Sequence, residues 1–394
     1  MKVMIKKDKK IAVYTDLFLT PSMTFIFRQL NAVSKSWQTF AIARSKANTN
    51  LFSYSDVYCS KRTIFERIIN KFLRIFGIRY IALRKASLKY FKSVLLKEKP
   101  SLIHAHFGPS ALEILPLAKS LNIPLITTFH GFDASLLLKN STYVKQLREL
   151  FDYSYILAVS EKMKLDLVQL GANDDRSKCA YIGVPLENFN FTQRTTLYEK
   201  FLRKDEISFL QVSNFVEKKG HKYTILAFSK LLEIYPNARL MLAGDGYLRD
   251  EMENYVLELG IEYAIQFVGH KNSTEVSKLM SKVDCFLHHS VTASDGDQEG
   301  IPTVIMEAMA TGLPVISTNH AGIPELITNN QNGYLVNERD ISAYVEAMIK
   351  VLEEKGSMGI SARKTIEKKF NMKIQIESLL DIYEGIVLEN KKNI

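Results

Sequence analysis

Short apolar runs of four or five residues alternate with amphipathic stretches along almost the whole chain. Runs of this length between helical patterns are typical of strands that are buried in a parallel sheet and joined by helical crossovers. A first series of predicted strands covers residues 11–14, 39–43, 102–105, 124–128 and 155–159, and a second covers residues 209–212, 239–243, 265–268, 285–288 and 314–317. The pattern predicts an α/β protein with two doubly wound, Rossmann-like sheets.

A polar stretch at residues 185–206 lies between the two series and is expected to be a linker. We place an N-terminal domain at residues 1–190 and a C-terminal domain at residues 191–371. A last helical pattern predicts a helix over about residues 372–394, which is expected to pack back on the first domain. Because ligands of doubly wound sheets bind at the carboxyl ends of the strands, two facing domains of this kind would enclose a binding cleft.

The net charge of +10 is concentrated in one segment. Residues 61–99 hold twelve basic and two acidic residues, with apolar residues at helical spacing between them. A basic amphipathic helix is typical of a surface that binds anionic lipid, and we expect a peripheral contact with an anionic membrane here. An ordinary helix packed on a sheet, with a solvated basic face, is the alternative. No RNA- or DNA-binding motif accompanies the charge, so nucleic acid is not an expected partner.

The remaining composition indicates a cytoplasmic protein. No apolar run reaches the roughly 18 to 20 residues that a transmembrane helix needs, and neither an apolar region nor a cleavage site follows the basic N-terminus. Three scattered cysteines, Cys59, Cys179 and Cys285, form no CxxC pair and are expected to be reduced. We expect the protein in the cytoplasm, with the basic segment at the inner face of the plasma membrane.

Two glutamates, Glu299 and Glu307, lie eight positions apart around the start of a predicted amphipathic helix that leads into a short buried strand. Free N–H groups and the dipole at a helix start favour an anion, and carboxylates accept hydrogen bonds from sugar hydroxyls. A ligand with both phosphates and hydroxyls, such as a nucleotide sugar, fits this combination. Pro302 has no N–H to donate. The N–H groups expected to bind the diphosphate or the sugar belong to Gly300, Ile301, Thr303 and Val304.

These glutamates belong to a longer sequence, residues 299–315, that resembles the signature of retaining glycosyltransferases of family 4. Further matches occur in the order typical of that family, at residues 127–133, 213–221, 242–246 and 322–325. Residues 21–26 and 295–298 resemble, more narrowly, the colanic acid and amylovoran type of exopolysaccharide transferase. The resemblance implies the GT-B fold, in which two Rossmann-like domains face each other across a cleft. It also implies a transfer that requires no cofactor or metal ion besides the nucleotide-diphosphate sugar.

In the second half of the chain, the resemblance implies roles for two glutamates and a lysine. Glu307, about two turns into the predicted helix, resembles the residue that binds the ribose hydroxyls. Glu299 resembles the residue that faces the donor sugar, and a loop or capping carboxylate is the alternative. Lys219 resembles the lysine that neutralises the diphosphate as the glycosidic bond breaks, with the adjacent Lys218 as the alternative. We therefore assign Glu299 and Lys219 to catalysis and Glu307 to donor binding.

Asn214 departs from the family pattern. Four or five residues before the lysine, the family commonly has an arginine that also contacts the phosphates, whereas this chain has Asn214. An amide keeps a hydrogen-bond donor but loses the charge and the bidentate geometry of a guanidinium. Either a nearby basic group substitutes, or phosphate stabilisation is weaker here. Together with Gly244 and Asp245 in the matched turn, Asn214 completes the expected donor-binding residues.

In the first half of the chain, His130 follows the predicted strand at residues 124–128 and resembles the histidine near the donor sugar and the reaction centre. A buried structural histidine is the alternative. Asp133 is expected to orient this loop, to cap the next helix or to contact the acceptor. His104 and His106 end another predicted strand. We expect these two to point to opposite sides and choose His106 as the residue that faces the cleft.

A metal site is not expected. His288 and His289 are adjacent and diverge in a strand, and no third ligand at a suitable spacing completes a set. Asp295 and Asp297 spell a DxD motif, but by resemblance GT-B transferases generally need no bound metal. We interpret these two acids as loop or acceptor-side residues.

Together these features predict a retaining glycosyltransferase that moves a sugar from a nucleotide-diphosphate sugar to a lipid-linked oligosaccharide or a growing cell-surface polysaccharide. Two alternatives are a nucleotide-sugar epimerase of the same fold and a nucleotide-sugar-binding subunit whose active site has decayed, which Asn214 leaves open. A dinucleotide oxidoreductase is disfavoured, because no GxGxxG follows the first predicted strand.

Overall fold

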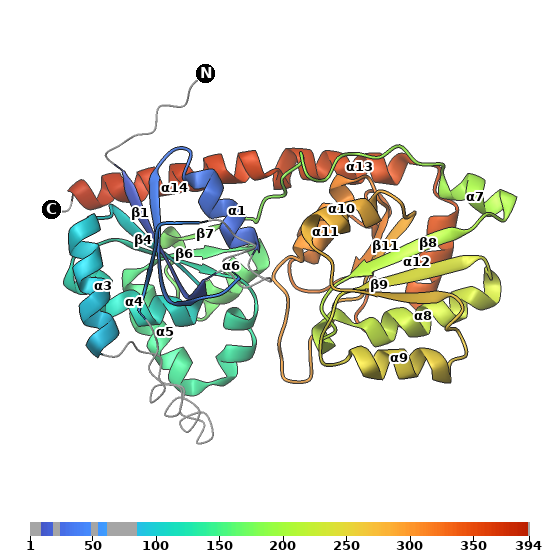
Figure 1. Cartoon of the computed structure of the whole chain (residues 1–394), viewed down its shortest axis with the longest axis horizontal. Helices are drawn as coiled ribbons and strands as arrows, with labels where there is room; N and C mark the ends of the chain where they lie inside the picture. The colour runs from blue at the N-terminus through green and yellow to red at the C-terminus, as the bar shows by residue number, and fades with distance from the viewer. Residues whose placement is uncertain (1–8, 19–23, 49–53, 61–84, 393–394) are drawn as a thin grey trace. The chain divides into compact units, whose positions relative to one another are not determined.

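A computed structural model describes residues 9–18, 24–48, 54–60 and 85–392 of the chain. These residues fold into two compact units (Figure 1). The first unit takes in the chain up to Tyr181 and again from Ile376, and the second runs from Ile182 to Gln375. Each unit contains one parallel sheet that is covered by helices.

The first unit is built on a seven-stranded sheet in the order β3-β2-β1-β4-β5-β6-β7, and each pair of neighbouring strands is parallel. The strands are β1 (Lys10–Phe18), β2 (Gln38–Lys46), β3 (Val57–Cys59), β4 (Leu102–His106), β5 (Leu125–Phe129), β6 (Tyr155–Ala158) and β7 (Ser177–Cys179). The helices are α1 (Thr24–Val33), α3 (Lys85–Glu98), α4 (Gly108–Ser120), α5 (Ser141–Tyr153) and α6 (Glu161–Gln169). Strand order reverses between β1 and β4, which is where ligands of such sheets bind.

The second unit is built on a six-stranded sheet in the order β10-β9-β8-β11-β12-β13. Its strands are β8 (Ile207–Val212), β9 (Ala238–Ala243), β10 (Ile265–Gly269), β11 (Cys285–His288), β12 (Val315–Thr318) and β13 (Tyr334–Val336). Its helices are α7 (Leu197–Arg203), α8 (His221–Ile234), α9 (Arg249–Glu258), α10 (Ser273–Met280), α11 (Thr303–Ala310), α12 (Ile341–Leu352) and α13 (Ser357–Thr365). The order reverses between β8 and β11.

The predicted fold class is confirmed: both sheets are parallel and doubly wound, and each of the ten predicted strands overlaps an observed one. The structure adds β3, β7 and β13, each three residues long and each at the edge of a sheet. An edge strand has one neighbour and is only partly buried, so its sequence need not contain the apolar run that identifies a central strand.

The stretch expected to be a linker, residues 185–206, is packed on the second unit and contains α7. Phe189 is fully buried, and the Arg194 guanidinium donates to the carbonyl oxygens of Met280, Val283 and Thr311. The polar residues that suggested a linker therefore hydrogen bond to the unit that follows them.

The long helix α14 (Met372–Lys392) contributes to the core of the first unit from Ile376 on. Leu379, Ile382, Tyr383, Ile386 and Val387 are buried in one apolar cluster with residues of β1 and β2. The Tyr383 ring lies 5.8 Å from that of Trp37.

Residues 61–84 of the basic segment lie outside the described residues, and its remainder forms α3. Phe91, Val94 and Leu95 of α3 are buried, with the Phe91 ring 5.9 Å from that of Tyr14 on β1, whereas the lysines of α3 with described side chains are exposed. This part matches the alternative of a packed helix with a solvated basic face.

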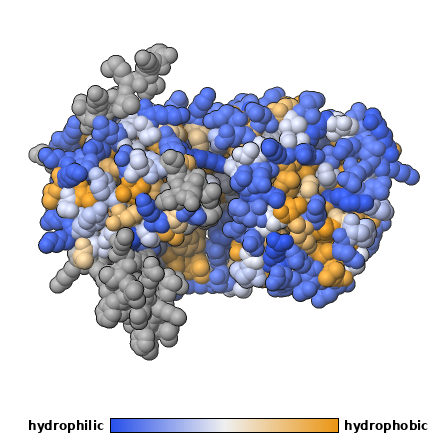
Figure 2. Space-filling view, in the orientation of Figure 1, coloured by the Kyte–Doolittle hydropathy of each residue, from blue (hydrophilic) through white to orange (hydrophobic). Residues whose placement is uncertain are grey.

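Among the described residues no helix is long and apolar enough to cross a membrane. Figure 2 shows mainly hydrophilic residues on the face in view.

Candidate functional site

Lys219 and Glu299 lie on neighbouring loops at the carboxyl edge of the second sheet. Lys219 ends a 3₁₀ turn, Glu217–Lys219, between β8 and α8, and Glu299 lies in the loop between β11 and α11. Because β8 pairs with β11, the two loops emerge side by side, and Lys219 Nζ lies 2.5 Å from Glu299 Oε1. Gly220 follows with a φ of 60°, and a Cβ atom at this position would lie 1.8 Å from the His289 carbonyl oxygen, so only glycine fits this close approach.

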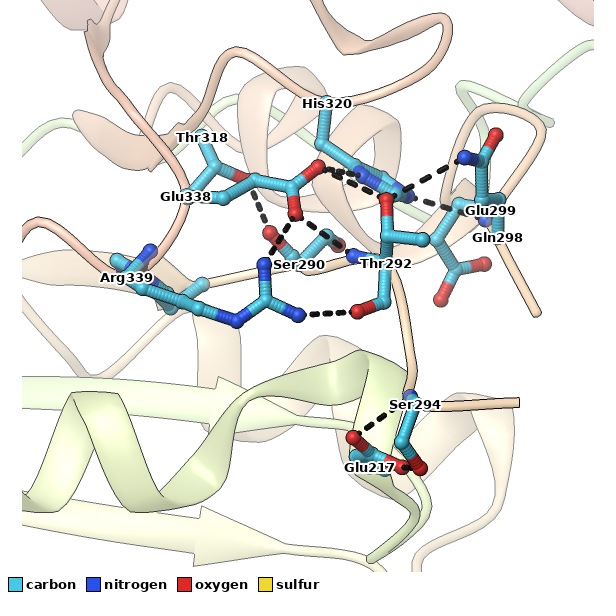
Figure 3. A network of polar contacts seen from close by, with 11 residues as sticks. Glu217, Ser290, Thr292, Ser294, Gln298, Glu299, Thr318, His320, Glu338 and Arg339 are labelled. Atoms are coloured by element: carbon cyan, nitrogen blue, oxygen red, sulfur yellow. Dashed lines mark hydrogen bonds and ion pairs between the residues drawn. The ribbon is translucent and has the colours of Figure 1, made fainter. Parts of the chain in front are cut away.

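The two loops are joined residue by residue. The Glu217 carboxylate accepts from the Ser294 N–H and hydroxyl at 2.8 and 2.6 Å (Figure 3), and Lys218 Nζ lies 2.8 Å from Asp297 Oδ2. The Val291 N–H also donates to the Lys218 carbonyl oxygen. Each residue of the turn is thus paired with the loop that carries Glu299.

Two lysines hold Glu299 in its ionised form. Burial raises the pKa of this carboxyl, but the charges of Lys219 and Lys218 and the hydrogen bond from Lys219 outweigh burial and hold the pKa at about 2. Burial lowers the pKa of Lys218, and the nearby Glu299 and Asp297 raise it above its ordinary value on balance. The site therefore contains a buried carboxylate and adjacent ammonium groups, which suit hydroxyl and phosphate ligands respectively.

Helix α11 begins directly after this loop. Pro302 occupies the N-cap position, so the N–H groups of Thr303 and Val304 belong to the first turn, which has no intrahelical acceptors for them. Gly300 and Ile301 are buried just before the helix. The expected N–H donors thus gather at one helix start.

Glu307 is only 9% exposed and lies little more than one turn into α11, since the helix begins at Thr303. The expected distance of about two turns from the helix start is therefore wrong. The helix starts only after Pro302, whose ring fixes the backbone that enters it.

Asn214 and Asp245 lie together on two packed loops. The Phe215 N–H donates to the Asp245 carbonyl oxygen at 2.9 Å, and both Asn214 and Asp245 are exposed. Gly244 has a φ of 146°, and a Cβ atom there would lie 1.9 Å from the Ser213 carbonyl oxygen. The two loops can approach this closely because Gly244 has no side chain.

A second network supports the loop of Glu299 from β12 and β13 (Figure 3). The Glu299 N–H donates to His320 Nε2 at 3.2 Å, and His320 Nδ1 lies 2.6 Å from Glu338 Oε1. Glu338 also accepts from the Thr292 N–H at 2.8 Å and from Arg339 Nη1 at 3.1 Å. Neither His320 nor Glu338 was identified from the sequence, because their importance depends on which loops are neighbours in space.

In the first unit, His106 and His130 are joined at the carboxyl ends of β4 and β5. His106 Nδ1 lies 3.1 Å from His130 Nε2, and among the described residues His130 Nδ1 has no hydrogen-bond partner. Burial, with a smaller contribution from His104, lowers the pKa of His130 to about 3. Burial also lowers the pKa of His106 well below its ordinary value, so both rings are neutral near pH 7.

The expectation that His104 and His106 point to opposite sides is wrong. Their ring centroids lie 4.4 Å apart, because residues two positions apart in a strand share a face. His104 is bound to the Tyr383 hydroxyl at 2.6 Å and to Thr128 Oγ1 at 2.7 Å. It thus links β4 to α14 and β5, which is a structural role.

Asp133 is fully buried and orders the loop after β5. Its Oδ1 accepts from the N–H groups of His130 and Gly131 at 2.9 and 3.1 Å, and its Oδ2 accepts from the Gly108 N–H at the start of α4 at 2.9 Å. Of the three roles expected for Asp133, these contacts show the orientation of the His130 loop. The helix that it caps precedes it in the sequence.

Two family models match the chain: one described as Glycosyltransferase Family 4 at residues 55–188, and one described as Glycosyl transferases group 1 at residues 193–372. The amylovoran biosynthesis glycosyltransferase AmsK of Erwinia amylovora is 30% identical over 289 residues, which are 72% of this chain and 70% of that protein. The chain belongs to glycosyltransferase family 4.

Other relatives of this family 4 glycosyltransferase agree with the assignment. The putative colanic acid biosynthesis glycosyltransferase WcaL of Escherichia coli is 29% identical over 72% of this chain and 70% of its own length. Among solved structures, Anabaena HepE in complex with UDP has a TM-score of 0.75 at 16% identity and covers 96% of this chain and 100% of its own. At that identity the likeness concerns the fold alone, and it agrees with the GT-B architecture expected for a family 4 enzyme.

The transferase has further histidines and acids near the site, but they do not form a metal-ligand set. The His288 ring stacks on Phe286 and the His289 ring lies 4.5 Å from that of Tyr344, so the two side chains have different neighbours. Asp297 pairs with Lys218. In the described parts of the chain, no group of three or more His, Cys, Asp or Glu side chains is placed to hold a metal ion.

Proposed function

We propose that this glycosyltransferase moves a sugar, with retention of anomeric configuration, from a nucleoside-diphosphate sugar to a lipid-linked oligosaccharide or a growing cell-surface polysaccharide. The observation that carries the proposal is the pairing of Lys219 with Glu299 beside the start of α11, where Glu307 also lies. Ammonium, carboxylate and helix-start N–H groups in one place suit a ligand with both phosphates and hydroxyls.

Relatives with named activities support the donor and the acceptor class. The structural neighbour HepE of Anabaena was solved with UDP-glucose, at a TM-score of 0.73 and 16% identity over 95% of this chain and 99% of its own. An Escherichia coli relative, 25% identical over 77% of this chain and 80% of its own length, is a UDP-Gal:alpha-D-GlcNAc-diphosphoundecaprenol alpha-1,3-galactosyltransferase. The relatives AmsK and WcaL are named for the synthesis of amylovoran and colanic acid, two exopolysaccharides.

In the proposed reaction, the bond between the anomeric carbon and the diphosphate oxygen breaks, and a bond to an acceptor hydroxyl oxygen forms on the same face of the sugar. The acceptor proton passes to the departing phosphate. Lys219 stabilises the negative charge that develops on that phosphate, because a fixed cation acts most strongly where charge appears in the transition state. Glu299 orients the donor sugar and Glu307 binds the ribose hydroxyls. His130 acts at the donor sugar, and no metal ion takes part.

We further propose that the enzyme works in the cytoplasm at the inner face of the plasma membrane, held there by the basic segment at residues 61–99. This segment carries a net charge equal to that of the whole chain, and each basic residue near an anionic surface contributes about 1 kcal/mol of attraction. A lipid-linked acceptor lies at the same surface.

The experiment that tests the donor is a screen of nucleoside-diphosphate sugars for thermal stabilisation of the purified protein, followed by transfer assays with those that bind. A ligand at a hundred times its dissociation constant stabilises the folded state by about 2.7 kcal/mol. The proposal requires at least one donor to bind and its sugar to appear in an acceptor. Release of a free epimerised sugar without transfer would instead identify an epimerase.

A further inference from the structure

His320 connects two carboxylate residues in the second unit, and the direction of its hydrogen bonds is fixed. The Glu299 backbone N–H can only donate, so His320 Nε2, 3.2 Å away, must present a lone pair. The ring proton is then on Nδ1, which lies 2.6 Å from Glu338 Oε1 and donates to it. The geometry therefore selects the neutral Nδ1–H tautomer of His320, which is 2% exposed.

Glu338 is itself held in place by the same loop that carries Glu299. Its carboxylate accepts from the Thr292 N–H at 2.8 Å, from the Thr292 hydroxyl at 3.2 Å and from Arg339 Nη1 at 3.1 Å. The Arg339 N–H in turn donates to His289 Nε2 at 3.0 Å. Glu338 thus binds the loop near its beginning at Thr292, and His320 carries that connection to its end at Glu299 (Figure 3).

Two further contacts clamp the loop between β11 and α11 from β12 and the residues that follow it. The Thr318 hydroxyl donates to the Ser290 carbonyl oxygen at 2.6 Å, and the Gly322 N–H donates to the Gly300 carbonyl oxygen at 3.1 Å. These bonds bracket residues 290–300 at both ends. Of Thr318, His320 and Gly322, it is His320 that bonds the Glu299 backbone itself, and it does so through its side chain.

We propose that His320, oriented by Glu338, is a positioning residue for Glu299: it fixes the Glu299 backbone so that the carboxylate meets both Lys219 and the donor sugar. The inference rests on the proposed function, since it gives Glu299 the sugar-facing role. His320 acts through the Glu299 N–H, and its own ring does not enter the reaction. Loss of this bond turns Glu299 away from the position that Lys219 and the sugar require.

Two substitutions separate the halves of this role. In His320→Gln, the side-chain oxygen reaches the place of Nε2 and still accepts from the Glu299 N–H. In His320→Asn, the amide N–H takes the place of Nδ1 and still donates to Glu338, but no acceptor remains for Glu299. The exposed His270 gives a control, His270→Asn. Expected results are a kcat/KM for the Gln variant within about threefold of the parent and a loss of about tenfold or more for Asn, a factor that corresponds to about 1.4 kcal/mol.

The loss in the Asn variant should appear in kcat, while the affinity for the nucleoside diphosphate without its sugar stays unchanged. A role in folding alone would lower kcat and the affinity for the nucleoside diphosphate together. Equal transfer rates in the Asn and Gln variants, with both at the parent level, would overturn the proposal.

Two measurements decide the inference independently of transfer. Imidazole ¹⁵N spectra should show His320 protonated at Nδ1 and unprotonated at Nε2, and the Glu299 amide should exchange its hydrogen faster in the Asn variant than in the Gln variant. A proton on Nε2, or equal exchange in the two variants, refutes the positioning role even when the parent enzyme is active. Failure of every donor in the parent enzyme refutes the proposed function, while the spectra and exchange rates still decide the role of His320.

Discussion

The Lys219 ammonium lies 2.5 Å from the Glu299 carboxylate, and both side chains are mostly buried. In the proposed reaction each side chain contacts a different part of the donor: Lys219 contacts the diphosphate and Glu299 contacts the sugar. Both side chains therefore contact one donor molecule, and a ligand that offers only the diphosphate lacks the contact with Glu299.

The ion pair makes a direct prediction for stability. Lys219→Met should lower the free energy of unfolding by about 3 kcal/mol, because it leaves the Glu299 charge buried with less compensation. The double variant Lys219→Met, Glu299→Gln should recover most of that loss. Urea unfolding of the parent, the two single variants and the double variant gives the coupling energy. Strictly additive effects would show that the pair does not couple in solution.

The pKa of Glu299 predicts how this stability depends on pH. The folded-state pKa of about 2 lies below the ordinary value of 4.5, so the ionised carboxylate stabilises the fold above pH 4.5. That contribution to the free energy of unfolding is lost as pH falls from 4.5 toward 2. Its size is about 3 kcal/mol, because a pKa difference of one corresponds to about 1.36 kcal/mol.

Urea unfolding of the parent and of Glu299→Gln at several pH values between about 7 and 3 isolates this contribution, because Glu338, whose pKa is also lowered, is the same in both proteins. The stability advantage of the parent should shrink as the pH falls. A constant difference over the range would contradict the assignment.

His130 should remain neutral throughout the pH range of ordinary assays. Burial lowers its pKa to about 3, with a smaller contribution from His104, and burial also lowers the pKa of His104 to about 3 and that of His106 well below its ordinary value. Ring NMR signals of His130 should therefore not shift between about pH 8 and pH 5. A midpoint for His130 inside that range would show that the ring is hydrated and charged.

The membrane proposal concerns residues 71, 74 and 79, which lie outside the described part of the chain. Neutralising Lys71, Arg74 and Arg79 should weaken binding to vesicles of anionic phospholipid by about a hundredfold, at about 1 kcal/mol per charge, and leave donor binding intact. The matched control neutralises three exposed lysines outside the basic segment, Lys145, Lys178 and Lys230. Unchanged vesicle binding in the first variant would discard the membrane role, and equal losses in both would point to net charge alone.

The central strands of both sheets could be predicted from the sequence because burial on both faces requires continuous apolar runs, as in residues 102–105 and 285–288. The edge strands β3, β7 and β13 carry no such signal. The start of α11 and the two glutamates near it could also be predicted, because they lie in one continuous stretch of sequence.

The supporting network could not be predicted in the same way. His320 and Glu338 lie 21 and 39 positions from Glu299 and meet its loop only because β12 pairs with β11, and β13 with β12, in the sheet. The two-residue period of a strand predicts that His104 and His106 share a face, so the expectation that they point to opposite sides was an error in reading that period. The ion pair of Lys219 with Glu299 depends on the pairing of β8 with β11, which the sequence does not specify.

The most direct test of the central claim is a transfer assay with a binding nucleoside-diphosphate sugar, comparing the parent enzyme with Lys219→Ala and Glu307→Ala. Removal of one group that stabilises transition-state charge lowers kcat by about a hundredfold or more, so the Lys219 variant should lose at least that much. The Glu307 variant should bind the donor more weakly, and the sugar should appear in the product with its anomeric configuration retained. Measurable turnover that neither substitution affects would contradict the site.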